Sequence, residues 1–352
     1  MNKTVGVCGY VSTGSSAFSD FLREFDDAKV LDSIEFTLTY ATDGLEDLEY
    51  HVKNYHKINQ SVVAIDRFRK FMKKPSHNRI TENKVEKITN DFLNKIIQYS
   101  WNLMGYATIV DSYVLSREKN FAKKCISKLV KILRFNTLIN MPGILFPYKM
   151  EVSIMPEEFD KASKVFISDI LDAMGREQNR VTVLDQPFEA CNPIRSFKFF
   201  DNPKVIISDR DPRDHYLFAK NFLRPRGFDF IPCDNVDDYI KYFRFVRKSP
   251  PDSRDRNDVI FFNFEELVYD YENTAKKIAN FAGVTQHAHK GKYFKPTHSR
   301  NNTQLFKKYS GFESDIKKIE RELPEYIFRF ENYPDIESEG GMFYGSQNRK
   351  RR

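Results

Sequence analysis

The stretch Gly9-Tyr10-Val11-Ser12-Thr13-Gly14-Ser15-Ser16-Ala17, which follows the apolar run Val5-Gly6-Val7-Cys8, decides the fold that we expect. The apolar run predicts a first strand over about residues 3–9, and the apolar spacing after Ser15 predicts a helix. Glycines allow a tight turn in which backbone amides and hydroxyl groups point inward at the helix N-terminus. The stretch therefore predicts a loop that binds a phosphate-like anion. A plain strand-to-helix turn with a serine N-cap remains the alternative.

The spacing of Gly9 and Gly14 is that of the two glycines in the P-loop of nucleoside triphosphatases. Ser15, however, stands where the P-loop lysine is required. Because that lysine contacts the terminal phosphates, its absence disfavours ordinary hydrolysis of ATP or GTP.

A second informative segment lies near position 210. Lys204-Val205-Ile206-Ile207-Ser208 has the composition of a buried strand, and the charged turn Asp209-Arg210-Asp211-Pro212-Arg213-Asp214 follows it. Open α/β sheets place their ligands at the carboxyl ends of such strands. Arg210 could bind a phosphate with its planar guanidinium. The alternative is a solvated turn whose charges only pair with one another.

In this order the two segments resemble the signature pair of the PAPS-dependent sulfotransferases, which use 3'-phosphoadenosine 5'-phosphosulfate. In that family the first loop binds the 5'-phosphosulfate and the second turn binds the 3'-phosphate. Thr13-Gly14-Ser15-Ser16 lies on the family's Ser-Gly-Thr-Thr, and Arg210-Asp211-Pro212-Arg213-Asp214 lies on its Arg-Asn-Pro-Lys-Asp. The resemblance thus implies one nucleotide site built from both segments.

Four further segments carry the same resemblance, which keeps its order from about residue 3 to residue 335. Val259–Leu267 is similar to the strand and Tyr-Glu-Asp-Leu turn, and Asn273–Gly283 to the helix that ends in Phe-Leu-Gly. Asp185-Gln186-Pro187 resembles a turn of bacterial carbohydrate-type members, and His289-Lys290-Gly291 the Arg-Lys-Gly loop. Two positions depart from the pattern. Ser12 replaces a Lys or Arg that contacts the sulfuryl group, and Phe218 replaces a Ser at the 3'-phosphate.

The resemblance implies a set of donor-binding residues: Ser12, Thr13, Gly14, Ser15, Ser16, Ala17, Arg210, Lys290 and Gly291. Sulfuryl transfer also needs a positive charge near the sulfuryl oxygens and a base for the acceptor hydroxyl. The basic run after the last family helix offers that charge through Lys290, Lys292, Lys295 and Arg300, and residues 297–303 are expected to form a polar lid.

Three residues are candidates for the base. Asp185 ends a predicted strand at the ligand edge of the sheet, although it could instead cap the next turn. His215 lies inside the second motif but opens a helix, where a packing role is expected. His298 belongs to the proposed lid.

Composition agrees with this interpretation. The chain has 352 residues, 41% of them hydrophobic, with 32 Phe and a formal net charge of +7. The charge favours anionic ligands, among which PAPS, an acidic glycan and a membrane surface are not distinguished. The four Cys are widely spaced, so no metal site is expected. No apolar run has the length of a membrane span, and no signal peptide is recognised, so we expect a cytoplasmic protein.

The strand and helix pattern predicts an α/β fold: a P-loop-like, mainly parallel β-sheet with helices on both faces and a helical insertion. Strands are expected at 34–38, 181–185, 204–209 and 258–263, and the insertion at about 45–150, where Phe92, Ile96, Ile97 and Trp101 continue a helical spacing. We expect one domain over 1–335 and a flexible basic tail over 336–352. Arg117–Arg134 reads as a basic amphipathic helix, either packed on the core or in contact with an anionic membrane surface or glycan.

These observations predict a sulfotransferase that moves a sulfuryl group from PAPS to a hydroxyl, releasing adenosine 3',5'-bisphosphate. The acceptor is expected to be a carbohydrate or surface glycan, by family analogy alone. No nucleic acid partner and no metal are expected. Two alternatives stay open: a P-loop kinase, which needs the missing lysine, and a non-catalytic protein that binds nucleotides or other anions at a degenerate site.

Overall fold

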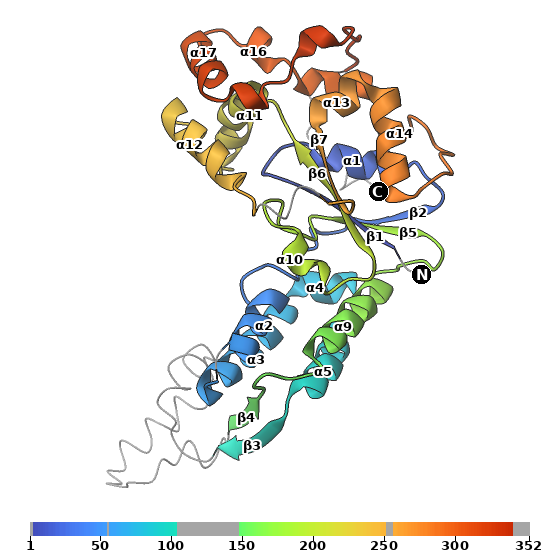
Figure 1. Ribbon diagram of the computed structural model, residues 1–352, viewed down its shortest axis with the longest axis vertical. Helices are drawn as coiled ribbons and strands as arrows, with labels where there is room; N and C mark the ends of the chain where they lie inside the picture. Colours follow the sequence, from blue (N-terminus) through green and yellow to red (C-terminus); the bar gives the residue numbers. More distant parts are fainter. Residues whose placement is uncertain (1–2, 55, 104–147, 251–255, 341–352) are drawn as a thin grey trace. The chain divides into compact units, whose positions relative to one another are not determined.

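The computed structural model describes residues 3–54, 56–103, 148–250 and 256–340 (Figure 1). The chain divides into two compact units. The first comprises Met1–Thr37 and Gly175–Arg352, and the second is Leu38–Met174.

A five-stranded sheet organises the first unit. Its strands, in the order β2-β5-β1-β6-β7, are β2 (Ala28–Leu31), β5 (Val181–Asp185), β1 (Thr4–Gly9), β6 (Pro203–Asp209) and β7 (Val259–Asn263). All neighbouring strands are parallel. The α/β class and four of the expected strands are confirmed. In parallel strands the carboxyl ends meet at one edge, where the loop after β1 and the turn after β6 both begin.

The prediction of a strand at 34–38 is wrong. The second strand in sequence is β2 at Ala28–Leu31, and residues 34–38 lie in bends and turns that follow it. Phe36 is buried, and its amide donates to the carbonyl of Asp185 at 2.7 Å. The apolar spacing there reflects burial of single side chains and not strand pairing.

Helices of the first unit connect and cover these strands. They are α1 (Ser15–Leu22), α10 (Ile194–Phe197), α11 (Pro212–Phe218), α12 (Val236–Val246), α13 (Phe264–Tyr269), α14 (Tyr271–Ala282), α15 (Pro296–Ser299), α16 (Leu305–Lys308) and α17 (Glu313–Glu322). A π-helical turn, Ala219–Leu223, continues α11.

Both faces of the sheet are covered, as expected. On one face, the odd-numbered β1 residues Val5 and Val7 pack with Phe18 and Phe21 of α1 and Ile278 of α14 in a buried cluster. The opposite face carries Gly6, where an added Cβ would lie 2.6 Å from Phe188. The segment around α10 therefore packs directly against the backbone of β1, and only glycine leaves room for it.

The second unit is mainly helical. It contains α2 (Leu45–Asn54), α3 (Ile58–Met72), α4 (Pro75–Ile80), α5 (Val85–Ile96) and α9 (Phe159–Ala173), with an antiparallel pair β3 (Tyr99–Leu103) and β4 (Tyr148–Val152). The helical spacing expected to reach Trp101 stops earlier, because α5 ends at Ile96 and Trp101 belongs to β3. The expected basic helix at Arg117–Arg134 and most of the basic tail lie outside the described residues.

Within the described ranges, no helix is long and apolar enough to cross a membrane.

Candidate functional site: the carboxyl edge of β1, β5 and β6

The loop between β1 and α1 is fixed to β6 by two hydroxyl side chains. The Thr13 hydroxyl lies 2.8 Å from the carbonyl oxygen of Ser208, and the Ser208 hydroxyl donates to the Thr13 carbonyl at 2.7 Å. Thr13 and Ser208 are both buried. The loop is therefore a preformed structure held by the neighbouring strand.

Close packing requires glycine at position 14. Gly14 has φ +91°, and an added Cβ would lie 2.7 Å from the ring of Phe264 at the start of α13. Ser12 also has a positive φ, of 63°. Such backbone angles turn successive amides toward the same side of a loop.

The first amides of α1 are available to a ligand. Among the described residues, the amides of Gly14, Ser15 and Ser16 have no hydrogen-bond acceptor, whereas the Ala17 amide donates to the Gly14 carbonyl at 3.0 Å. Three free amides at a helix N-terminus carry partial positive charge and suit an anion. Of the predicted donor-binding residues, Gly14, Ser15 and Ser16 are thus the best placed to donate.

Arg210 is brought to this loop, as the two motifs imply. Its Nη1 lies 3.3 Å from the carbonyl of Ser12, and its Nη2 donates to the carbonyl of Asn302. The side chain is buried, with its guanidinium 4.9 Å from the ring centre of Phe218 and 5.7 Å from that of Phe264.

The guanidinium of Arg210 is incompletely satisfied. Its buried Nε has no hydrogen-bond partner, and no carboxylate of the described chain forms an ion pair with it. Burying a cation that forms no direct ion pair is costly, so this position is suited to an anionic ligand. The position could therefore hold a phosphate group, which is what the sequence motif led us to expect of Arg210.

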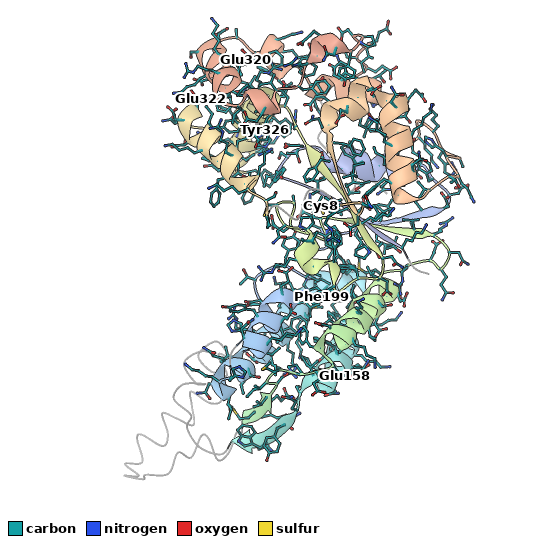
Figure 2. The ribbon with its side chains drawn as sticks, viewed as in Figure 1. Cys8, Glu158, Phe199, Glu320, Glu322 and Tyr326 are labelled. Carbon is teal, nitrogen blue, oxygen red and sulfur yellow. The ribbon has the colours of Figure 1, made fainter. Side chains whose placement is uncertain are left out.

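The rest of the turn after β6 is buried, so the solvated alternative is wrong. Asp211 caps α11 by accepting from the Arg213 amide at 2.8 Å. Arg213 pairs with the Asp211 carboxylate at 2.7 Å and with Glu320 at 2.8 Å. Figure 2 labels Glu320 on α17. The Asp214 carboxylate accepts from the amides of Gln304 and Leu305 at 2.7 and 2.6 Å.

Burial changes the acidity of two carboxyl groups beside Arg210. Burial and the neighbouring Asp211 raise the pKa of Asp214 to about 7. The same two causes raise the pKa of Glu265, whose Oε1 accepts from the Asp211 amide at 3.1 Å. These groups hold the turn in place through backbone amides, and none of them reaches the loop.

His215 has a buried position beside the loop, which argues against a role as the base. It is 1% exposed, with Nδ1 2.9 Å from the Tyr239 hydroxyl and Nε2 2.7 Å from the Val11 carbonyl. Burial, and then the charge of Arg247, lower its pKa to about 3. Because Nε2 must donate to the Val11 carbonyl, the ring stabilises the loop and has no free nitrogen for an acceptor hydroxyl.

Asp185 lies at the carboxyl end of β5, paired in register with Val7 of β1. It is 4% exposed. The next residue, Gln186, has φ 51° and directs its amide to the loop, with Oε1 3.2 Å from the Gly9 amide and Nε2 3.1 Å from the Ser15 hydroxyl. Asp185 therefore stands beside the loop at the edge of the sheet where a ligand would bind.

The basic run after α14, unlike the turn after β6, has exposed lysines. Lys290 is exposed and pairs with Glu272 at 2.7 Å, Gly291 has φ +75° with open space around it, and His298 lies 3.6 Å from Glu339. Among the contacts of the described residues, none joins these three to the loop at 9–17. The expected lid reaches the site through Asn302 alone, whose carbonyl accepts from Arg210.

Sequence reasoning missed the part played by Asn302, Glu265 and the Gln186 side chain in this site. Gln186 stood in a recognised turn, and a polar residue after a strand that neighbours β1 was an available signal. Asn302 and Glu265 contribute long-range contacts that no local pattern indicates.

Comparison with known proteins found no matching family model and no matching curated protein sequence. Solved structures of similar fold include a sulfotransferase from Alicyclobacillus acidocaldarius, 11% identical over 91% of this chain and 95% of that one, with a TM-score of 0.36. The sulfotransferase domain from the curacin biosynthetic pathway is 11% identical over 92% and 98%, with a TM-score of 0.38. Retinol dehydratase, solved with androsterone and the inactive cofactor PAP, is 12% identical over 94% and 83%, with a TM-score of 0.35. These structural neighbours include members of the family that the sequence motifs resemble.

Proposed function

We propose that this protein transfers a sulfuryl group from PAPS to a hydroxyl group of an acceptor, releasing adenosine 3',5'-bisphosphate. The proposal rests on two elements that are each suited to an anion and that lie next to each other: the loop after β1 and Arg210 in the turn after β6. Within the described part of the chain, the amides of Gly14, Ser15 and Ser16 have no acceptor, and Arg210, in the turn after β6, is a buried cation with an unpartnered Nε. A ligand with two separate phosphate groups matches both elements.

Each element has a role in this proposal. The loop 12–17 would hold the 5'-phosphosulfate through its amides and hydroxyls, and Arg210 would hold the 3'-phosphate. PAPS supplies the activated sulfuryl group. Free amides aimed at the leaving phosphate would stabilise the negative charge that develops on it.

Asp185 is the base of this proposal. A carboxylate can accept the proton of the attacking hydroxyl when it lies within hydrogen-bond reach of it. Of the candidates other than His215, whose ring is bonded to the Val11 carbonyl, Asp185 is the one beside the loop, since β5 pairs directly with β1 and Gln186 contacts the loop itself. We further propose that the acceptor is a carbohydrate or surface glycan and that Lys290 and Gly291 close over the donor when it binds.

A non-catalytic nucleotide-binding protein is the second candidate. It is favoured by Ser12, which supplies no charge at the sulfuryl position, and by Lys290, which is paired with Glu272. Both the sulfotransferase and the non-catalytic protein would bind the nucleotide, but only the sulfotransferase would transfer a sulfuryl group.

Turnover is tested with radiolabelled PAPS and a panel of acceptors, including oligosaccharides, simple sugars, phenols and steroid alcohols. Sulfuryl transfer to an oligosaccharide or sugar above the rate of PAPS hydrolysis is the expected result. Transfer only to phenols or steroids would overturn the carbohydrate assignment. Tight binding of adenosine 3',5'-bisphosphate with no transfer to any acceptor would favour the non-catalytic candidate.

A further inference from the structure

The loop at 9–17 is held from two sides, and the two sides differ in chemistry. On the β6 side, the Thr13 and Ser208 hydroxyls bond to backbone carbonyls in a buried, reciprocal pair. On the β5 side, a single carboxamide, that of Gln186, spans the two ends of the loop at Gly9 and Ser15. The second contact involves the side chain of Ser15, the first residue of α1, whose amide has no acceptor among the described residues.

The backbone explains how Gln186 reaches the loop. Its amide donates to the Val7 carbonyl at 2.9 Å, which extends the ladder between β5 and β1 by one residue. The backbone then turns into the left-handed region, with φ 51°, which a non-glycine residue rarely adopts. This turn sends the side chain across the end of β1 and not along the direction of β5.

The direction of the two hydrogen bonds of the Gln186 side chain determines which way the Ser15 hydroxyl can donate. The Gly9 amide donates to Oε1 of Gln186, and Nε2 of Gln186 donates to the Ser15 hydroxyl. Because Ser15 Oγ accepts this bond, its own proton is left to donate elsewhere. The Ser15 amide also has no acceptor in the described chain. The hydroxyl and the amide of Ser15 can therefore both donate to an anion.

We propose that Gln186 is a positioning residue that orients Ser15 as a donor to the 5'-phosphosulfate of the nucleotide. The inference rests on the proposed function, whose donor occupies this loop. Gln186 acts through Ser15 and Gly9 and does not itself contact the donor. A carboxamide is required because it accepts at one atom and donates at the other.

Glutamate at position 186 separates this role from a structural one. Gln186→Glu keeps the shape of the side chain and an acceptor for the Gly9 amide. Its carboxylate can only accept from the Ser15 hydroxyl, so the serine proton would turn away from the ligand. It also adds a negative charge beside the loop. Gln186→Leu removes both hydrogen bonds and adds no charge, and serves as the matched variant.

The test measures, by calorimetry, the binding of adenosine 3',5'-bisphosphate and of adenosine 3'-monophosphate to the wild type and both variants. Only the first nucleotide carries a 5'-phosphate to occupy the loop. We expect Gln186→Glu to weaken binding of the bisphosphate about 30-fold and Gln186→Leu about fivefold. Binding of the 3'-monophosphate should change less than twofold in either variant, with the melting temperature as the folding control.

Two results would overturn the inference. In the first, Gln186→Glu binds the bisphosphate as tightly as the wild type does. In the second, both nucleotides weaken equally, which would mean that Gln186 supports the fold and not the 5'-phosphate. A wild type that does not distinguish the bisphosphate from the 3'-monophosphate would instead refute the proposed donor site, and the role of Gln186 would fall with it.

Discussion

Two groups of charged residues were candidates for the site, and the fold treats them differently. The turn after β6 is buried: Arg210 is 4% exposed and Asp214 is fully buried. The basic loop after α14 is exposed: the Lys290 and Glu272 side chains, which pair with each other, are 55% and 68% exposed. Buried charges have a large cost unless they meet a partner, whereas exposed pairs contribute little. In our proposal the buried turn therefore forms the fixed part of the site, and the exposed loop can join it only when a ligand binds.

The largest effect is expected in turnover, where Asp185, a buried residue at the end of β5, is compared with a residue of the exposed group. Asp185→Asn should lower the rate of sulfuryl transfer by about 10²–10⁴-fold, since it removes the proposed base without changing the size of the side chain. His298→Asn, in the exposed group, should change the rate less than threefold. The rate is measured with saturating PAPS and acceptor. A larger loss in His298→Asn than in Asp185→Asn would contradict the assignment of the base to Asp185.

The second prediction tests packing of the loop after β1, which Arg210 of the buried turn contacts. Gly14→Ala should lower the free energy of unfolding by about 2–4 kcal/mol, because its Cβ meets the Phe264 ring and its φ is positive. Gly175→Ala is the control, since Gly175 has nearly the same φ, +92°, and nothing within 4 Å. The free energy of unfolding of Gly175→Ala should fall by only about 1 kcal/mol. Equal losses in denaturant titrations would mean that contact with Phe264 does not shape the loop.

The third prediction concerns pH. The pKa of His215 is lowered to about 3 in the folded protein, so below its ordinary value of 6.5 only the unfolded state takes up the proton. The wild type should therefore lose stability relative to His215→Asn as pH falls from 6.5 toward 4, by up to about 1.4 kcal/mol per pH unit. Denaturant titrations at pH 7 and pH 5 measure this. His298→Asn should show no such trend. If the difference in free energy of unfolding between the wild type and His215→Asn is the same at both pH values, the ring of His215 is not neutral and buried as described.

The smallest effect is expected at the surface. Lys290→Ala breaks an exposed ion pair and should change the free energy of unfolding by less than about 1 kcal/mol. Its effect on the binding of adenosine 3',5'-bisphosphate measures whether Lys290 closes over the donor. A loss of more than tenfold would show that the exposed loop joins the site on binding, and would weaken the contrast between the two groups.

The sequence predicted the parts of this site that depend on local pattern. The runs at 4–9, 181–185, 203–209 and 259–263 are short, apolar and followed by polar turns, so their strand character and their shared carboxyl edge were predictable. The strand at 34–38 was mispredicted because two buried side chains, Phe36 and Leu38, imitate strand alternation.

The remaining features depend on contacts between distant residues. The burial of Arg210 is determined by Phe218, Phe264 and the carbonyl of Asn302, which lie 8 to 92 positions away and have no fixed spacing. The same holds for His215, whose ring bonds to Val11 across the sheet edge. Motif matching identified these positions, but it could not separate a ligand-binding side chain from one that supports the loop.

The measurement that tests the central claim most directly is calorimetric titration of the wild type and Arg210→Ala with adenosine 3',5'-bisphosphate, set against ATP with Mg²⁺ and adenosine 5'-monophosphate. We predict binding that requires the 3'-phosphate and that weakens about 100-fold, or about 3 kcal/mol, in Arg210→Ala. Binding of ATP with Mg²⁺ but not of the bisphosphate would contradict the account and favour a kinase. Bisphosphate binding that is unchanged in Arg210→Ala would contradict the role assigned to the buried arginine.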